Sequence, residues 1–557
     1  MAEPMYDFVI VGGGSAGCAL ANRLSADPTN RVLVLEAGRP DYRWDVFTHM
    51  PAAMGLAISS SRHNWKFISE PEPFMHNRRM PHPRGKLFGG SSSINAMVYQ
   101  RGHPADFDRW AADPGMQQWD HAHCLPYFRR LENSLAHGHT EYRGNGGPQT
   151  LERGAVDNPL WDAFFLAAQQ AGYALTPDIN GAKQEGFGPF DRMISRGRRM
   201  SAARAYLHPV MSRRNLAVRS RALVTKIDFA GTRAVGVTYR DSKGVEHVVR
   251  SNEVVLSGGA FNSPQVLQLS GVGNPDELAA MDISPVHDLP AVGEYLEDHL
   301  AVQVQHSCTQ PVSVIKMKQR HNWPIMGLQW LLRRGPATSN IFEGGGFVRS
   351  NDQLDYPDVT MTFAPIAMKF DPENEIKGHG YMVHVATMVA DARGTVKLAS
   401  QDPTAHPKIL FNYLSNERDR GDWVTAVRIA RRLLDQPAFQ QYDGGEVLPG
   451  PSVETDEEIL DWVARTAQTG LHPSGTCRMG TDDKTAVIDP ATMRVHGLDG
   501  LRVVDASVMP HVTNGSTYAP VMMIAEKSAD LILGNTPLEP QYVGAQRDEK
   551  GSMPQGR

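Results

Sequence analysis

The sequence has little of what marks secreted, membrane-spanning or nucleic-acid-binding proteins. Its 557 residues include only four cysteines, at positions 18, 124, 308 and 477, and no CxxC pair, so neither a disulfide framework nor a metal site is predicted. No apolar run approaches the roughly 20 residues of a transmembrane helix. Lys and Arg total 56 against 61 Asp and Glu, a formal net charge of -5. Because a nucleic-acid-binding chain would be basic, nucleic acid is not expected as a partner.

The N-terminus also lacks the pattern of a secretory signal. It reads MAEPMYDFVIVGGG, without a basic first region or a small-residue cleavage site. With the low cysteine content, this predicts a cytoplasmic protein without an integral membrane segment. Hydrophobic residues make up 41% of the chain, and its length corresponds to about three or four domain-sized units or two large ones.

Patterns typical of regular structure recur along the chain. Buried strands are predicted at residues 6–11 and 31–35, and alternating apolar and polar residues predict strands of two further sheet regions at 221–256 and 355–400. Amphipathic helices are predicted within 156–172 and 420–440. The long irregular stretch 39–110 is typical of a segment that covers or contacts a ligand.

A glycine-rich turn joins the first predicted strand to a helix. Gly12–Gly17 satisfies GxGxxG, and Glu36 lies nineteen residues beyond Gly17, at the end of the next strand. Gly12 permits the tight turn, Gly14 lets the backbone approach a pyrophosphate, and Gly17 lets helix and strand pack closely. Glu36 is placed to accept hydrogen bonds from ribose hydroxyls. The pattern predicts a dinucleotide site but does not separate NAD from FAD.

Three more motifs follow in order. They are RGKLFGGSSSIN at 84–95, SGGAFNSP at 257–264, and HPSGT at 472–476 with VVDAS at 503–507. In this order they resemble the glucose-methanol-choline (GMC) oxidoreductase family, from Tyr6 to about Leu533. Within that family the chain is most similar to the bacterial choline dehydrogenase and alcohol dehydrogenase branch.

The resemblance implies an α/β protein with two interleaved domains. A Rossmann-like FAD-binding domain is expected to carry an inserted α+β substrate domain built on a mixed or antiparallel sheet. The FAD-binding segments are expected at 1–155, 201–310 and 465–535, and the substrate-domain segments at 156–200 and 311–464. The polar residues 536–557 are predicted to form a mobile tail.

The cofactor implied by the resemblance is FAD. The residues expected to hold its pyrophosphate and adenosine end are Gly12, Gly14, Ser15, Ala16 and Glu36, with the backbone of Val224 at the adenine. Those expected along the flavin are Gly89, Gly90, Asn95, Ala96, Met97 and Val98, and those at the ribityl-pyrophosphate region are Asp505 and Ala506. Ile94 stands where some relatives carry a covalent histidyl link, so FAD is expected to bind non-covalently.

The resemblance also assigns the catalytic residues. His472, in HPSGT, matches the family's catalytic histidine. A histidine suits removal of a hydroxyl proton because its ordinary pKa of about 6.5 lies near neutral pH. The family usually places Asn or His at the second catalytic position, where this chain has Ser516. Serine donates and accepts hydrogen bonds but is no base unaided, and Asn514 is the alternative if the loop is shifted.

The substrate positions depart from those of the choline-oxidising branch. Ala301 stands where that branch typically has Glu, and Thr362 where it has a histidine, whereas Trp65 is widespread in the family. A quaternary ammonium is bound by aromatic faces and usually a carboxylate. The expected reaction is therefore oxidation of an uncharged primary alcohol to an aldehyde by hydride transfer to flavin N5.

Three alternatives remain open from the sequence. The chain could be a choline dehydrogenase, a non-redox lyase of the same family, or a flavin-binding protein with little activity. The expected partners are a small alcohol and an electron acceptor, O2 or a quinone, and a quinone would imply loose membrane association. Neither the oligomeric state nor the choice between oxidase and dehydrogenase follows from the sequence.

Overall fold

The computed structural model describes residues 5–368 and 376–544. Its first large sheet has the strand order β12-β2-β1-β15-β14-β13, with β26 also paired to β15. These strands are β1 (Tyr6–Val11), β2 (Val32–Glu36), β12 (Leu216–Ser220), β13 (Leu223–Ala230), β14 (Arg233–Arg240), β15 (Glu246–Leu256) and β26 (Leu501–Val503). The β12, β2, β1, β15 and β26 strands run parallel, and β13–β15 form an antiparallel meander.

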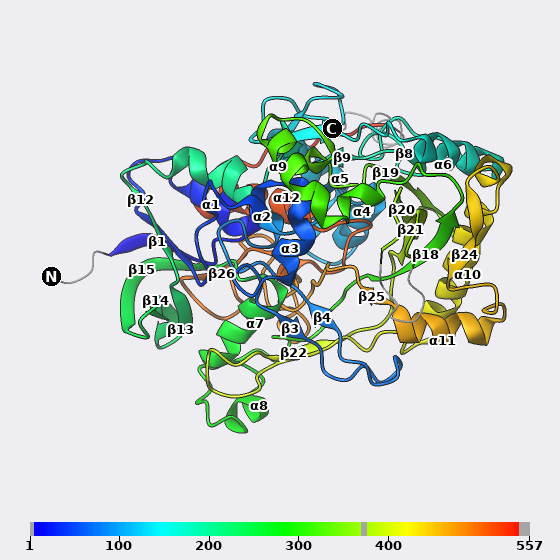
Figure 1. Cartoon of the computed structure of the whole chain (residues 1–557). Helices are drawn as coiled ribbons and strands as arrows, with labels where there is room; N and C mark the ends of the chain where they lie inside the picture. The colour runs from blue at the N-terminus through cyan, green and yellow to red at the C-terminus, as the bar shows by residue number, and fades with distance from the viewer. Residues whose placement is uncertain (1–4, 369–375, 545–557) are drawn as a thin grey trace, which may run out of the picture.

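The second large sheet is antiparallel, with the order β24-β18-β21-β20-β19-β8 and β25 beside β18. Its strands are β8 (Gly186–Pro189), β18 (Leu300–Cys308), β19 (Gly344–Val348), β20 (Val359–Ala364), β21 (Gly380–Thr387), β24 (Asp443–Leu448) and β25 (Gln468–Thr469). The helices on its outer side are α6 (Pro159–Gln170), α10 (Glu417–Leu434) and α11 (Asp456–Thr466) (Figure 1). The two sheets, each with its helices, confirm the predicted α/β fold class.

The remaining helices lie around and between the sheets. They are α1 (Ser15–Leu24), α2 (Val46–His49), α3 (Met54–Ser59), α4 (Pro104–Ala111), α5 (His121–Leu131), α7 (Gly259–Leu269), α8 (Pro275–Ala279), α9 (Trp323–Leu331) and α12 (Tyr518–Leu533). The short strands are β3 (Phe67–Ile68), β4 (Pro81–His82), β5 (Val98–Tyr99), β6 (Glu132–Ser134), β7 (Gln149–Arg153), β9 (Asp191–Arg192), β10 (Ile194–Ser195), β11 (Arg198–Arg199), β16 (Val272–Gly273), β17 (His287–Asp288), β22 (Thr395–Lys397) and β23 (Lys408–Leu410). Within the described residues, no helix combines the length and apolarity needed to cross a bilayer.

The first crossover follows from its sequence. All of β2 is buried and most of β1 is, as a parallel strand covered on both faces requires. A Cβ on Gly17 would lie 1.9 Å from the carbonyl oxygen of Gly12, so only glycine lets α1 pack this closely on the turn. The C-terminal helix α12 packs beside α1 and α5, so segments from both ends of the chain share one core.

Two strands near the expected domain boundaries pair in the second sheet. The strand β18 lies in the second sheet, although residues 201–310 were assigned to the FAD-binding domain, and β25 pairs with it from beyond position 465. The chain therefore enters the second sheet earlier, and leaves it later, than the predicted boundaries. The reason is that β18 is buried from Leu300 to His306 and pairs with β21 over seven residues.

The first part of the predicted mobile tail is held against α5. The backbone N–H of Leu538 donates to the Tyr127 hydroxyl at 3.1 Å, and that of Gln541 donates to the carbonyl of Ala122 at 2.8 Å. Residues 536–544 are thus anchored, because their backbone groups find partners on a packed helix. Residues 545–557 lie outside the described residues.

A buried carboxylate ties α12 to its neighbours. The Glu526 carboxylate contacts Arg23 of α1 at 2.7 Å and Arg130 of α5 at 2.9 Å, and it accepts a hydrogen bond from the Tyr206 hydroxyl at 2.7 Å. Removing one member of such a buried group leaves its partners without an acceptor.

We expect Glu526→Gln to lower the free energy of unfolding by about 3 kcal/mol, because two arginines lose their counter-charge. Urea denaturation followed by circular dichroism measures the change. The matched control is Glu457→Gln, which removes an exposed carboxylate in the first turn of α11. Equal stability of the two variants would contradict a stabilising role for this cluster.

Candidate active site

A cavity of about 540 Å³ extends between the two sheets. One end is formed by the glycine-rich turn, the ends of β1, β2 and β15, and the start of α7. The other end is lined by strands β18, β20 and β21 and by the loop that carries His472. A cavity of this kind, with many backbone groups at one end and apolar side chains at the other, fits a large cofactor with a small substrate beside it.

The dinucleotide end has the shape and the donors that a pyrophosphate requires. Gly12 has a φ of +104°, and a Cβ there would lie 2.5 Å from the Ser257 carbonyl oxygen. Gly14 caps α1 without any side-chain hydrogen bond to the first backbone N–H groups. A Cβ on Gly90 would lie 2.8 Å from the Cα of Gly14. The open helix start and the space kept by these glycines fit the FAD pyrophosphate.

Two buried carboxylates shape this end. Glu36 accepts the backbone N–H of Gly13 at 2.8 Å and of Gly38 at 2.7 Å, while burial raises its pKa to about 7. Asp505 accepts the Gly259 N–H at 2.8 Å and the Ser263 hydroxyl at 2.6 Å, which fixes the start of α7. Both side chains line the cavity, so each positions backbone as well as facing the cofactor region.

The structure brings most of the predicted cofactor residues to this cavity. Those that line it are Gly12, Gly14, Ser15, Ala16, Glu36, Gly90, Asn95, Ala96, Met97, Val98, Val224, Asp505 and Ala506. Gly89 does not line the cavity. Its N–H donates to the Gly13 carbonyl at 2.8 Å, so it holds the backbone of the glycine-rich turn. Ile94 is also outside the lining and packs with Leu87 and Ala57 in a small apolar cluster.

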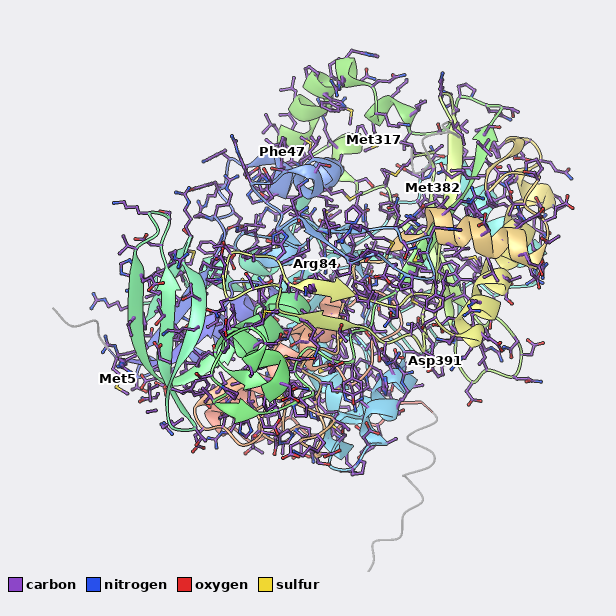
Figure 2. All side chains as sticks on the ribbon, turned by 90° about the horizontal axis from the view of Figure 1, so that it is seen from below. Met5, Phe47, Arg84, Met317, Met382 and Asp391 are labelled. Atoms are coloured by element: carbon purple, nitrogen blue, oxygen red, sulfur yellow. The ribbon has the colours of Figure 1, made fainter. Side chains whose placement is uncertain are left out.

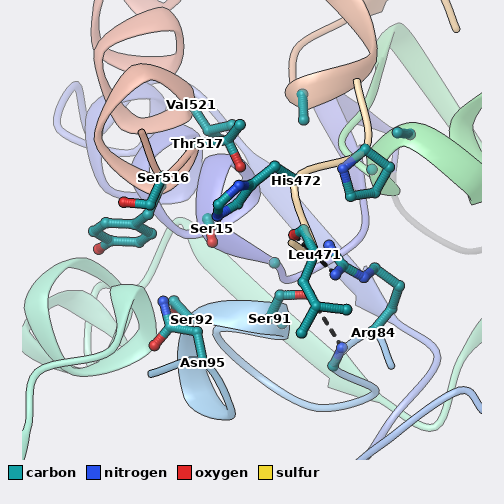
Figure 3. Close-up of a pocket in the computed structure, with 18 of the residues that line it drawn as sticks. Ser15, Arg84, Ser91, Ser92, Asn95, Leu471, His472, Ser516, Thr517 and Val521 are labelled. Atoms are coloured by element: carbon teal, nitrogen blue, oxygen red, sulfur yellow. Dashed lines mark hydrogen bonds between the residues drawn. The ribbon is translucent and has the colours of Figure 1, made fainter. Parts of the chain in front are cut away.

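The loop before His472 is held by Asp298, a residue that sequence reasoning missed as functional. Its Oδ1 accepts the His472 backbone N–H at 2.6 Å, and its Oδ2 accepts the hydroxyls of Thr469 at 2.5 Å and Tyr413 at 2.7 Å. Arg84 adds a hydrogen bond of 2.9 Å to the Leu471 carbonyl (Figure 3). The signal in the sequence was an acidic residue directly before the histidine of Asp298-His299.

The imidazole of His472 is paired with that of His299. The two Nδ1 atoms lie 2.9 Å apart, and His299 Nε2 lies 3.2 Å from the Met388 carbonyl oxygen. A carbonyl only accepts, so His299 Nε2 carries the proton and its Nδ1 accepts one from His472 Nδ1. In the neutral pair, His472 Nε2 is therefore unprotonated and able to take a proton.

The surroundings keep these histidines neutral. Burial, followed by the nearby His299 and Arg84, lowers the pKa of His472 well below its ordinary value. Burial lowers the pKa of His299 to about 4, and that of His384 likewise to about 4. At neutral pH the site therefore holds unprotonated imidazoles rather than imidazolium ions.

Ser516 and Asn514 occupy different environments. Ser516 lines the cavity; its N–H donates to Gln100 Oε1 at 2.9 Å and its hydroxyl lies 3.3 Å from the Val98 carbonyl. Figure 3 shows Ser516 on the same side of the pocket as the His472 ring. Asn514 is outside the lining, where its amide donates to Pro357 and Gln184. The geometry thus gives the serine, not the asparagine, access to the cavity.

The predicted substrate residues separate into two groups. Trp65 and Thr362 line the cavity, and the Lys86 ammonium lies 4.1 Å from the centre of the Trp65 ring. Ala301 does not line it: the residue is fully buried and packs with a cluster that includes Phe190. Its expected contact with the substrate stays a prediction.

A histidine missed by sequence reasoning lies opposite Thr362. His384 on β21 is the direct cross-strand partner of Thr362 on β20, and it lines the cavity. Gln303 Nε2 donates to His384 Nδ1 at 3.1 Å, so in the neutral ring the proton is on Nε2. No motif marked this residue, since only strand pairing places it beside Thr362.

Comparison with known proteins gives consistent results across the chain. GMC oxidoreductase family models match residues 6–301 and 390–525. An oxygen-dependent choline dehydrogenase of Staphylococcus xylosus is 53% identical over 541 residues, covering 97% of this chain and 96% of the relative. An oxygen-dependent choline dehydrogenase of Staphylococcus aureus is 54% identical over 541 residues, covering 97% of this chain and 95% of the relative.

Solved structures share the fold over nearly the whole chain. Pyridoxine 4-oxidase from Mesorbium loti superposes with a TM-score of 0.86 at 31% identity, covering 95% of this chain and 100% of that one. A formate oxidase variant from Aspergillus oryzae, studied for FAD modification, gives a TM-score of 0.89 at 26% identity, covering 96% and 99%.

We expect Gly90→Ala to lower the flavin content of the purified protein, because its Cβ would press on the Gly14 backbone at 2.8 Å. The ratio of flavin to protein absorbance measures this. Gly231→Ala is the matched control: its φ is also positive, at +63°, but nothing lies within 4 Å of its Cβ. Full flavin content in Gly90→Ala would contradict the assignment of this cradle.

Proposed function

Since the chain belongs to the GMC oxidoreductases, FAD-dependent enzymes that act on CH–OH donors, we propose that its substrate is an uncharged primary alcohol, oxidised to the aldehyde. The observation that carries the proposal is the charge of the cavity. Among the described residues that line it, the only carboxylates are Glu36 and Asp505, and both belong to the dinucleotide end. A quaternary ammonium beside His472 would lose water without gaining a counter-charge.

The substrate end offers apolar contacts and uncharged polar groups. Its apolar lining includes Trp65, Phe342, Met368, Met382 and Met388, and its polar lining includes Thr360, Thr362 and Gln303. Such a lining binds a hydrocarbon chain or ring while leaving hydrogen-bonding groups for one hydroxyl.

The proton of the alcohol is taken by His472. Its Nε2 is unprotonated because Nδ1 donates to His299, and the Asp298 carboxylate fixes the loop through the His472 N–H. We propose that the Nε2–H of His384 donates to the alcohol oxygen while its proton leaves, which is supported by its tautomer and its place in the cavity lining. Ser516 supplies a second hydroxyl to the same region. FAD, when bound in the adjoining cradle, supplies the hydride acceptor.

We propose that FAD binds non-covalently. The position of the histidyl link in some relatives is occupied by Ile94, an aliphatic side chain packed with Leu87 and Ala57. Reoxidation then requires an acceptor, O2 or a quinone, and assays with each in parallel separate the two.

Choline is the second candidate substrate, favoured by the 53–54% identity to choline dehydrogenases over nearly full length. Anaerobic mixing with a panel of uncharged primary alcohols and choline distinguishes them by bleaching of the oxidised flavin band. We expect kcat/KM for the best uncharged alcohol to exceed that for choline at least tenfold, because the cation finds no carboxylate. Faster reduction by choline than by every other alcohol would overturn the substrate class, and no bleaching by any alcohol would favour the lyase alternative.

We expect His472→Ala to lower the rate of flavin reduction by roughly 100- to 10,000-fold while FAD stays bound. The control is His76→Ala, which removes an exposed histidine paired with Asp461. Because the base must be neutral and its pKa is lowered, the wild-type rate should stay constant as the pH falls through about 6.5 and decline only below it. An acid limb centred at or above about 6.5 would argue against His472 as the buried base.

A further inference from the structure

Helix α9 carries apolar side chains on the face that points to solvent. Met326 and Trp330 are buried on its inner face, where they pack with Ala337. The outer side chains of the helix and the residue after it are between 41% and 63% exposed: Trp323, Ile325, Leu328, Leu331 and Leu332. Contiguous exposed apolar surface of this kind is rare on a soluble monomer and marks an interaction site.

A second segment extends this surface. Met50 and Ala52, next to α2 and α3, pack against the inner cluster of α9. The same segment exposes Trp44, Val46, Phe47 and Leu56, with Trp44 at 72%. In Figure 1 α2 and α3 lie beside α9, and in Figure 2 Phe47 and Met317 lie together at one edge of the molecule. We call these two sets of exposed residues, on 44–56 and 323–332, the apolar face.

The border of the apolar face is basic, although the chain as a whole is not. Residues 315–334 contain five Lys or Arg and no Asp or Glu, in a protein with a net charge of -5: Lys316, Lys318, Arg320, Arg333 and Arg334. Arg204 lies near three further guanidinium groups, those of Arg198, Arg333 and Arg43. Burial is the largest cause that lowers the pKa of Arg204, and these three positive charges lower it further.

The acidic side chains on these segments are already engaged. Asp41 is buried and contacts His208 at 2.7 Å, and Asp45 is buried between His63 and Arg39. They therefore leave the positive charge at the border of the apolar face largely uncompensated.

We propose that the apolar face docks onto an anionic phospholipid bilayer, with α9 lying in the plane of the interface. A nine-residue helix is about 14 Å long, too short to cross a hydrocarbon core but suited to insertion of one side. Tryptophan and leucine on the inserted side with Lys and Arg at its border is the composition of interfacial helices. A second copy of the chain is a poorer partner, because like-charged borders would face each other.

The apolar face adjoins the cavity through α3. Met54 and Ile58 line the cavity, whereas Leu56 between them is exposed on the apolar face. Docking would therefore bring this wall of the cavity close to the bilayer. This last step rests on the proposed function, but the docking itself does not.

The test is co-sedimentation of the FAD-loaded enzyme with vesicles of phosphatidylcholine, with and without phosphatidylglycerol. We expect binding to the anionic vesicles that weakens with added salt. The Leu328→Asp/Leu331→Asp variant should bind at least tenfold more weakly, since it places two charges in the inserted side. The matched control is Leu166→Asp, a leucine 49% exposed on α6, which should bind like wild type. Flavin content and the rate of flavin reduction by a soluble alcohol should be the same in both variants as in wild type.

If the Leu328→Asp/Leu331→Asp protein does not retain flavin, a second variant tests vesicle binding instead. Arg333→Glu/Arg334→Glu changes only exposed residues and should also lose at least tenfold in binding to the anionic vesicles. The proposal is overturned if wild type binds neither vesicle, or if the variants bind as wild type does. It is also overturned if sedimentation velocity shows a wild-type dimer that Leu328→Asp/Leu331→Asp dissociates while no vesicle binding occurs.

Discussion

The hydrogen bonds of the buried Asp298 carboxylate hold the loop that carries His472, the candidate base, against the second sheet. Asp298 lies just before β18 in the second sheet, and it accepts the backbone N–H of His472 together with the hydroxyls of Thr469 and Tyr413. A single buried acceptor thus fixes a loop from the end of the chain against a strand from its middle. Without it, this loop would still keep the hydrogen bond from Arg84 to the Leu471 carbonyl and the contact between the His299 and His472 rings.

Burial serves the same site in a second way. The low-dielectric surroundings of His299, His384 and His472 disfavour their charged forms, so all three remain neutral at neutral pH. Neutral rings have one donor and one acceptor nitrogen, and the fixed partners Met388 and Gln303 decide which is which. The site thereby presents an acceptor at His472 and a donor at His384, the pair that the proposed removal of a hydroxyl proton would use.

The local sequence is sufficient to identify the glycine-rich turn, because each glycine there meets a local steric requirement. Gly12 takes a positive φ, and Gly17 leaves no room for a Cβ, so the spacing alone identified the turn. The substrate end depends on contacts that no local pattern marks. Ala301 lies in a buried cluster outside the cavity lining, and His384 faces Thr362 across two paired strands. Those positions depend on the pairing of β18, β20 and β21, which are far apart in sequence.

By itself the sequence determined the dinucleotide turn, the order of the family motifs and the candidate base, since these depend on residues within a few positions of each other. Only the tertiary structure decided which nitrogen of His472 is free, that Ser516 rather than Asn514 reaches the cavity, and that α9 turns its leucines outward. The physical reason is that hydrogen-bond partners, burial and exposure are properties of contacts between distant segments, which no local pattern specifies.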